Sequence, residues 1–295
     1  MQKITPFLWF NDQAEEAMKM YISLFKNGKI LNVTRYGKAG EEVSGRKAGS
    51  VMTVAFELNG QQFAGINGGP VFKLTEAISL FVYCKTEKEV DMLFQKLSEN
   101  GQILMPLNKY PFSEKYAFIK DKFGLAWQIM LSPKTPSHIA PCFLFVGKSL
   151  GNAEAAINLY LKIFKDTKIN QISHYEKGEP GKPGTVKHAS FLVEGQEFIA
   201  MDGEGPHKFA FNEAFSFFVN CEDQKEIDYY WKSLTKEGEE GQCGWLKDKF
   251  GISWQIVPAG LGKMLADPKK SEKVMTVLLK MKKLELSILE QAFNT

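Results

Sequence analysis

Long hydrophobic runs and a strong net charge are both missing from this sequence. No apolar run reaches 18 residues, whereas a helix that crosses a membrane needs about 20, so no membrane partner is expected. The opening stretch MQKITPFLWF has a strand-sized apolar run and not the pattern of a secretory signal peptide. The net charge is only +3, and the lysine-rich residues 259–295 carry it. The remainder is close to neutral, which argues against nucleic acid as a partner.

Cysteine motifs and nucleotide-binding loops are also missing. The cysteines Cys84, Cys142, Cys221 and Cys243 form no CxxC pair. They therefore predict reduced thiols in a cytoplasmic protein, and not a disulfide or zinc framework. No glycine-rich loop follows a predicted strand in the way that a Rossmann-type methyltransferase requires. With 44% hydrophobic and 24% charged residues, the chain is typical of a globular protein long enough for two domains.

The second half of the sequence repeats the first. The stretch DKFGLAWQIM at 121–130 returns as DKFGISWQIV at 248–257, and further pairs keep the same order in both halves. One such pair is AEEAMKMYISLF with AEAAINLYLKIF, and another is FELNGQQFAGING with FLVEGQEFIAMDG. The period is too long for a solenoid and predicts a duplicated domain. We expect domains at 1–132 and 138–258, joined by a proline-containing linker, and a helical extension at 259–295.

Each copy is predicted to contain two βαβββ modules. In the first module the apolar run ITPFLWF indicates a strand, and the next segment has apolar residues at helical spacing. Further strands follow, and Asn59–Gly60 between two of them is typical of a tight hairpin. Four such modules predict an α+β chain with a C-terminal helical tail.

The motifs resemble those of the PhnB-like, or 3-demethylubiquinone-9 3-methyltransferase-like, branch of the vicinal oxygen chelate superfamily. That superfamily includes glyoxalase I, extradiol dioxygenases and bleomycin-resistance proteins. The resemblance rests on QCGWLKDKFGISWQIVP (242–258) and FSFFVNCEDQKEIDYYWKSL (215–234), and more loosely on FIKDKFGLAWQIM (118–130). It covers residues 3–258 and implies two glyoxalase-like domains with U-shaped mixed sheets around pockets. The motifs are specific for the family and weak for chemistry, so methyltransferase activity is not expected.

The resemblance also implies where a metal would bind. Metal-dependent members place His, Glu or Gln ligands on facing strands. The matching positions in this sequence are Thr5, Ser79 and Gln128 in the first copy and Ala140, Ser216 and Gln255 in the second. Hydroxyls, an alanine and one glutamine per copy are a poor donor set for a divalent ion. No cofactor is therefore predicted, and a bound divalent metal is the less favoured alternative.

Strand alternation predicts which side chains line the pockets, because residues two apart share a face. The candidates are Gln255, Ser216, Phe218, Asn220 and Cys142 in the second copy and Gln128, Ser79, Trp9 and Tyr83 in the first. The larger side chains of the first copy favour a filled pocket there and a more open one in the second. A mostly apolar surface with a few polar groups suits a small-molecule site and equally a sheet core, so both readings stay open.

Other side chains are weighed separately. His188, on a predicted strand, is a candidate base because its ordinary pKa lies near neutrality, with a structural role as the alternative. Trp245 is a candidate for a pocket edge. Trp127 and Trp254 alternate away from the glutamines and are expected to anchor the helices. Asp202 is expected to cap a turn.

The two copies differ before their last strand. Gly101 to Asp121 spans 20 residues, whereas Gly238 to Asp248 spans 10, so the second copy should have a shortened sheet, which either opens one side of its pocket or creates an edge for packing. The tail carries an apolar stripe and is expected to pack across an intramolecular pseudo-dimer of the copies. The chain itself is expected to be a monomer or a dimer.

Two functions are consistent with these observations. The favoured one is a metal-free protein that binds an unknown small molecule in a sheet-lined pocket. The alternative is a metal-dependent enzyme of glyoxalase, dioxygenase or isomerase type. The sequence does not name the ligand.

Overall fold

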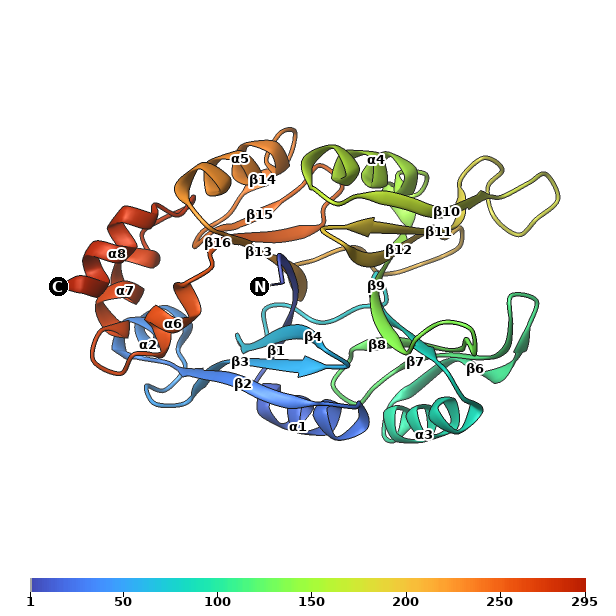
Figure 1. The fold of residues 1–295 in the computed structure, drawn as a ribbon, viewed down its shortest axis with the longest axis horizontal. Coiled ribbons are helices and arrows are strands. Elements are labelled where there is room, and N and C mark those ends of the chain that lie inside the picture. The colour runs from blue at the N-terminus through green and yellow to red at the C-terminus, as the bar shows by residue number, and fades with distance from the viewer. Residues whose placement is uncertain (1) are drawn as a thin grey trace. The chain divides into compact units, whose positions relative to one another are not determined.

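The computed structural model describes residues 2–295, which form four βαβββ modules and a helical tail (Figure 1). The first two modules comprise β1 (Ile4–Phe10), α1 (Ala14–Leu24), β2 (Lys29–Arg35), α2 (Lys38–Ser44), β3 (Val51–Leu58) and β4 (Gln61–Asn67), then β5 (Ile78–Cys84), α3 (Glu87–Ser98), β6 (Gln102–Tyr110), β7 (Ser113–Lys120) and β8 (Ala126–Leu131). The next two comprise β9 (His138–Phe145), η1 (Gly147–Ser149), α4 (Ala153–Ile163), β10 (Lys168–His174), β11 (Val186–Val193) and β12 (Gln196–Asp202), then β13 (Phe215–Cys221), α5 (Gln224–Leu234), β14 (Glu239–Glu240), β15 (Trp245–Lys247) and β16 (Ser253–Pro258). The tail comprises α6 (Leu261–Ala266), α7 (Ser271–Leu278) and α8 (Leu286–Asn294).

The chain folds into two compact units, each built around an eight-stranded mixed sheet. Unit 1 consists of Met1–Lys73 and Asn212–Thr295, and unit 2 of Leu74–Phe211. The strand order is β14-β15-β16-β13-β1-β4-β3-β2 in unit 1 and β10-β11-β12-β9-β5-β8-β7-β6 in unit 2. The α+β class, the four modules, the mixed sheets and the helical tail are therefore confirmed.

Each sheet joins one module from each sequence copy. Strand β1 pairs with β13, and β5 pairs with β9, both antiparallel. The expectation that each copy forms a sheet of its own is therefore wrong. The reason is that the first strand of a module has an open edge that must pair, and the corresponding strand of either copy offers a similar partner. The ranges 1–132 and 138–258 stay a prediction about the repeated sequence units.

One face of each sheet is covered by helices. In unit 1, α1 packs on β2, β3 and β4, and α5 packs on β13, β15 and β16. Both helices are amphipathic and turn their apolar residues to the sheet, as the helical spacing predicted for α1. The buried side chains are Ala14, Ala17, Met18 and Tyr21 on α1 and Ile227, Tyr230, Trp231 and Leu234 on α5.

The repeated DKFG motif specifies the turn before the last strand of each copy. Asp248 accepts hydrogen bonds from the backbone N–H groups of Phe250 (2.9 Å) and Ile252 (3.1 Å) and from Trp254 Nε1 (3.0 Å). Gly251 has a φ of +86°, which favours glycine. Trp254 is buried, and the first copy shows the same three bonds to Asp121. The predicted structural role of both tryptophans is confirmed.

Helix α2 was not predicted, and the tail differs in detail from the predicted helical extension. Asp267 Oδ1 accepts from the backbone N–H groups of Lys269 (2.8 Å) and Lys270 (3.1 Å), so it caps the turn that leads into α7. The tail then bends twice and forms three short helices in place of one stripe-bearing helix. Within residues 2–295, no helix is both long and apolar enough to span a membrane.

Candidate functional site

The face of each sheet that lies opposite its helices carries alternate strand residues, and we call it the inner face. The register places Ser216 beside Phe7 and Ser253, and it places Phe218 beside Thr5 and Gln255. The inner face of unit 1 thus holds the predicted candidates Gln255, Ser216, Phe218, Asn220, Trp9 and Trp245. That of unit 2 holds Gln128, Ser79, Tyr83, Cys142 and His188.

This distribution corrects the predicted grouping of pocket residues. Thr5 was expected to share a concave surface with Ser79 and Gln128, but it lies in unit 1, and they lie in unit 2. Cys142 was grouped with Gln255 and instead lies opposite Ser79. The physical reason is the pairing of β1 with β13 and of β5 with β9, which brings modules of different copies together.

Gln128 is the polar centre of the inner face of unit 2, and it is fully hydrogen-bonded. Its Nε2 donates to Ser79 Oγ at 2.9 Å and to Cys142 Sγ at 3.3 Å. Its Oε1 accepts from the hydroxyl of Tyr116 at 2.6 Å. Burial raises the pKa of Cys142 to about 12, so this thiol stays protonated and is neither a nucleophile nor an anionic ligand.

A row of polar side chains crosses the inner face of unit 2 on neighbouring strands. Glu197 Oε2 lies 2.5 Å from His138 Nε2, and Glu197 Oε1 accepts from Ser190 Oγ. His138 Nδ1 lies 2.8 Å from the carbonyl oxygen of Pro136, which can only accept, so Nδ1 carries a proton. The His138 ring stacks on Tyr83 with centroids 4.4 Å apart. The row is therefore internally paired.

The pKa values of this row follow from burial and pairing. Burial lowers the pKa of His138, but hydrogen bonds to Glu197 and Pro136 outweigh it and leave that pKa raised. Burial raises the pKa of Glu197, but hydrogen bonds from His138 and Ser190 outweigh it and leave that pKa lowered. Burial lowers the pKa of His188, which keeps this imidazole neutral near pH 7. Its role as a base stays a prediction.

The inner face of unit 1 has the same glutamine in a different environment. Gln255 Nε2 donates to Ser216 Oγ at 2.9 Å, as Gln128 does to Ser79. No group in residues 2–295 donates to Gln255 Oε1, and this oxygen is not among the fully buried atoms without a partner, so solvent or a ligand can reach it. Ser253, which pairs with Ser216 in the register, is fully buried, and its hydroxyl has no hydrogen-bond partner within the same residues.

Aromatic rings surround these polar groups. Phe7 lies between Phe218 and Trp245, with ring centroids 4.3 Å and 6.0 Å away. Trp9 lies edge-on to Trp245 at 6.3 Å and donates its indole N–H to the carbonyl of Gly69 at 2.8 Å. Asn220 Nδ2 donates to the carbonyl of Gln2 at 3.0 Å. The inner face of unit 1 thus combines aromatic side chains with a buried Ser253 hydroxyl that has no partner within residues 2–295.

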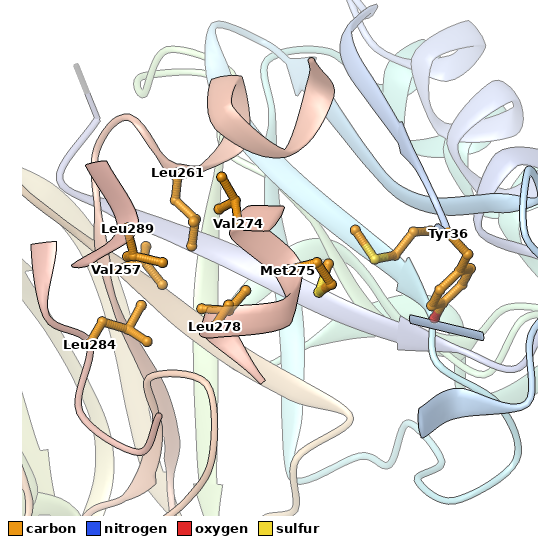
Figure 2. Close-up of a cluster of buried hydrophobic side chains, with 9 residues drawn as sticks. Tyr36, Val257, Leu261, Val274, Met275, Leu278, Leu284 and Leu289 are labelled. Carbon is orange, nitrogen blue, oxygen red and sulfur yellow. The ribbon is translucent and has the colours of Figure 1, made fainter. Parts of the chain in front are cut away.

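The tail packs on the inner face of unit 1. Tail side chains form one buried cluster with Val257, Tyr36 and Met52 (Figure 2). Phe218 and Ile66 pack against this cluster. The buried tail members are Leu261, Val274, Met275, Leu278, Leu284 and Leu289. The tail thereby buries apolar surface that the shortened β14–β15 hairpin leaves uncovered, and every contact of this cluster lies within unit 1.

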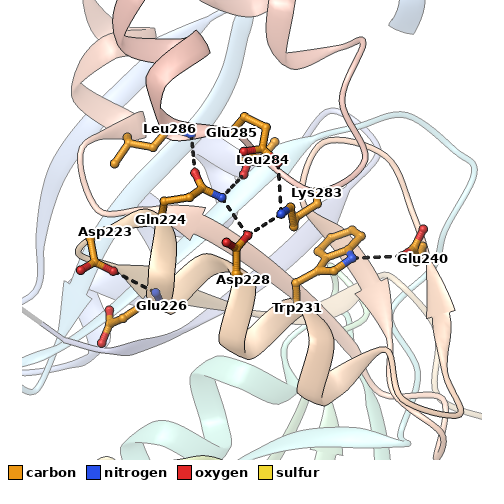
Figure 3. Close-up of polar contacts among 10 residues, drawn as sticks. All are labelled: Asp223, Gln224, Glu226, Asp228, Trp231, Glu240, Lys283, Leu284, Glu285 and Leu286. Carbon is orange, nitrogen blue, oxygen red and sulfur yellow. Dashed lines mark hydrogen bonds and ion pairs between the residues drawn. The ribbon is translucent and has the colours of Figure 1, made fainter.

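Hydrogen bonds hold the tail in place. The N–H groups of Cys243 and Gly244 donate to the carbonyls of Met281 and Lys282, both at 2.7 Å, which confirms a packing edge at the shortened hairpin. Gln224, at the start of α5, donates to the carbonyl of Leu284 (3.1 Å) and accepts from the N–H of Leu286 (2.7 Å) (Figure 3). The same glutamine donates to Asp228 at 3.0 Å, and this carboxylate also pairs with Lys283.

One further predicted residue has a structural role, and three residues of the inner face of unit 2 were not predicted. Asp202 accepts from the N–H groups of Gly151 (2.6 Å) and Val186 (2.9 Å), which confirms turn capping. Tyr116, His138 and Glu197 were not predicted. A position-by-position comparison of the two copies was the available signal, because Glu197 stands where the first copy has Gln62, and Tyr116 stands where the second copy has Cys243.

The positions that the resemblance implied for metal ligands do not fit a divalent ion here. In unit 2 they hold Ser79, Gln128 and Ala140, and the neighbouring Cys142 thiol stays protonated. In unit 1 they hold Thr5, Ser216 and Gln255, so only neutral oxygens are offered. Over the described range 2–295, no group of three or more His, Cys, Asp or Glu side chains has an arrangement able to hold a metal ion.

Comparison with known families accounts for the repeat. The model of the family described as 3-demethylubiquinone-9 3-methyltransferase matches twice, at residues 2–130 and 137–257. The chain belongs to this family. No curated protein matches the chain. A PhnB protein from Bacillus cereus is 46% identical over 44% of this chain and 100% of its own, with a TM-score of 0.41.

Two further solved structures are similar to this chain. A protein from Staphylococcus aureus is 39% identical over 44% of this chain and 97% of its own, with a TM-score of 0.19. Glyoxalase I from Zea mays is 11% identical over 87% of this chain and 93% of its own, with a TM-score of 0.54. This chain thus carries two PhnB-like copies in tandem, and its likeness to glyoxalase I concerns the fold alone.

Proposed function

We propose that the protein binds a small, uncharged organic molecule on the inner face of unit 1, under the C-terminal tail. One observation carries the proposal. The Ser253 hydroxyl is fully buried without a partner beside Gln255, whose carbonyl oxygen no described group supplies with a donor. A buried polar group left unpaired costs about 1–3 kcal/mol, and a bound water or ligand that pairs with the Ser253 hydroxyl would remove this cost.

Unit 2 supports the choice of unit 1 by contrast. Its equivalent glutamine, Gln128, already receives a hydrogen bond from Tyr116, and Ala126 stands where unit 1 has Ser253. In unit 2 both the amide nitrogen and the amide oxygen of Gln128 are hydrogen-bonded, whereas in unit 1 only the amide nitrogen of Gln255 is bonded within the described residues. The aromatic side chains Phe7, Phe218 and Trp245 supply the apolar walls for a ligand body.

The proposal contains no metal and no methyl transfer. No grouping of side chains among residues 2–295 favours the metal-dependent alternative, and the sequence has no glycine-rich loop for a nucleotide-type methyl donor. A cytoplasmic location belongs to the proposal and is supported by the four free thiols. The intramolecular pseudo-dimer of the two sequence copies also stays a prediction. Whether the chain is a monomer or a dimer in solution is a second prediction, and light scattering checks it.

The test compares the Gln255→Ala and Gln128→Ala variants. Ligand-observed NMR with a library of uncharged aromatic and aliphatic fragments identifies molecules that bind the intact chain. Gln255→Ala should abolish binding, and Gln128→Ala should leave it within about twofold, because only Gln255 presents an unpaired acceptor. Circular dichroism and thermal unfolding establish that both variants fold. Fragments that bind equally well to both folded variants would remove Gln255 from the site and contradict the proposal.

A further inference from the structure

The duplication provides a direct comparison of two equivalent glutamines. Gln128 pairs with Phe81 across the β5–β8 ladder, and Gln255 pairs with Phe218 across the β13–β16 ladder. Each Nε2 donates to a serine of the neighbouring strand at 2.9 Å. The two amides are therefore held in the same way, and each presents its Oε1 atom at the equivalent place on its inner face.

The donor to that oxygen differs between the units. In unit 2, the Tyr116 hydroxyl donates to Gln128 Oε1 at 2.6 Å, with the phenol ring buried against Phe81. Tyr116 is two residues before Phe118, the ladder partner of Gln128. The residue two before Trp245, the ladder partner of Gln255, is Cys243. Unit 1 therefore lacks the phenol.

The tail does not replace this missing donor. Cys243 directs its thiol to the carbonyl oxygen of Leu278 at 3.6 Å and away from the role that Tyr116 plays. The tail side chains that pack nearby are apolar, and they include Leu278 and Leu284. The tail thus supplies the hydrophobic cover of the absent hairpin residues but no O–H group. Gln255 Oε1 is therefore left to accept from water or from a ligand at the point where unit 2 has a phenol hydroxyl.

The walls around Gln255 suit an aromatic ring. Phe218 packs against Phe7 with centroids 4.3 Å apart, and Phe7 meets Trp245 edge-on at 6.0 Å. Offset-stacked and edge-to-face aromatic pairs are favourable beyond the burial of their area. A ring placed among them gains stacking or edge contacts that an aliphatic body of similar size does not.

We propose that the ligand of unit 1 is a small uncharged phenol, whose hydroxyl donates to Gln255 Oε1 as Tyr116 donates to Gln128 Oε1. This inference rests on the proposed function and narrows it to a chemical class. Burial raises the pKa of Tyr116, and a phenol in the equivalent buried place of unit 1 stays protonated for the same reason, so it can donate. The Ser253 hydroxyl provides a second polar contact beside the same site.

The test uses three probes of similar size, 4-fluorophenol, 4-fluoroanisole and cyclohexanol, with binding measured by fluorine NMR for the first two and by calorimetry for all three. The intact chain should bind 4-fluorophenol about tenfold more tightly than 4-fluoroanisole, which lacks the O–H donor, and more tightly than cyclohexanol, which lacks the ring. Gln255→Met keeps the size of the side chain and removes the acceptor, so the phenol preference should disappear. Gln128→Met is the matched control and should retain it.

A reciprocal variant tests the same idea in unit 2. Tyr116→Ala removes the resident phenol, and 4-methylphenol should then raise the thermal midpoint of the variant more than 4-methylanisole does. If the intact chain binds 4-fluorophenol and 4-fluoroanisole equally well and Gln255→Met binds neither, the assignment to phenols is overturned. Gln255 would then still belong to a ligand site. If no probe and no library fragment binds with dependence on Gln255, both the phenol inference and the proposed function fail.

Discussion

Replacing Asp248 by alanine should destabilise unit 1 severely. The carboxylate accepts three hydrogen bonds, from two backbone N–H groups at 2.9 and 3.1 Å and from the Trp254 indole at 3.0 Å. Asp248 is 3% exposed and Trp254 1% exposed, so water does not readily replace the lost acceptor. At about 1–3 kcal/mol for each stranded donor, the loss should reach about 3 kcal/mol or more.

Urea unfolding followed by tryptophan fluorescence measures this loss. With a slope of about 2 kcal/mol per M, the midpoint should fall by about 1.5 M. Asp248→Asn keeps one acceptor oxygen and should cost less than alanine. Asp12→Ala, at an exposed position of unit 1, is the matched control and should change the free energy of unfolding by no more than about 0.5 kcal/mol. A loss below about 1 kcal/mol for Asp248→Ala would refute the view that the repeated motif specifies the fold.

Two further predictions concern the tail and the polar row of unit 2. Leu284 lies in the buried tail cluster, so Leu284→Ala should lower the free energy of unfolding in urea by about 2–5 kcal/mol. Ile288 on the next helix is 43% exposed, so the control variant Ile288→Ala should lower it by less than about 0.5 kcal/mol. Equal losses in the two variants would argue against burial of the tail. The pair His138–Glu197 stabilises the fold most between pH 4.5 and pH 6.5, the ordinary pKa values of the two groups. The raised pKa of His138 gives stability that is fully present below pH 6.5 and is lost as the pH rises through the raised pKa. The lowered pKa of Glu197 gives stability that is fully present above pH 4.5 and is lost as the pH falls through the lowered pKa. Glu197→Gln should therefore lower the thermal midpoint more at about pH 6 than at about pH 9, and a pH-independent difference would contradict the pairing.

The sequence predicts the modules well because their signals are local. Apolar spacing identifies α1 and α5, and Asn59–Gly60, both at positive φ, forms the predicted hairpin. The pairing of modules is a long-range choice that local patterns do not encode. Strands β5 and β13 are similar in sequence, and β1 pairs with β13 although β5 is nearer in the chain. Similar edge strands leave the partner undecided until the whole chain is packed.

The candidate site was partly accessible from sequence for the same reason. Strand alternation placed Gln255, Ser216 and Phe218 on one face, and the register confirms it. Alternation does not show which donors reach a given acceptor. The hydroxyl of Tyr116 comes from β7, and the tail that covers unit 1 comes from a segment without any repeat, so neither contact follows from periodicity.

Duplication within one chain explains how two such different inner faces coexist. In an assembly of identical single-domain chains, replacing Tyr116 by a smaller residue would remove the hydrogen bond to the glutamine oxygen in every subunit at once. Each buried oxygen left without a donor would cost about 1–3 kcal/mol. In the tandem chain, Tyr116 keeps one centre saturated, and Cys243 leaves the other open. Unit 2 thus has a completed core, and the tail supplies apolar packing where unit 1 has only the short β14–β15 hairpin. The open acceptor of Gln255 costs unit 1 little, because its oxygen is not fully buried and can accept from water until a ligand binds.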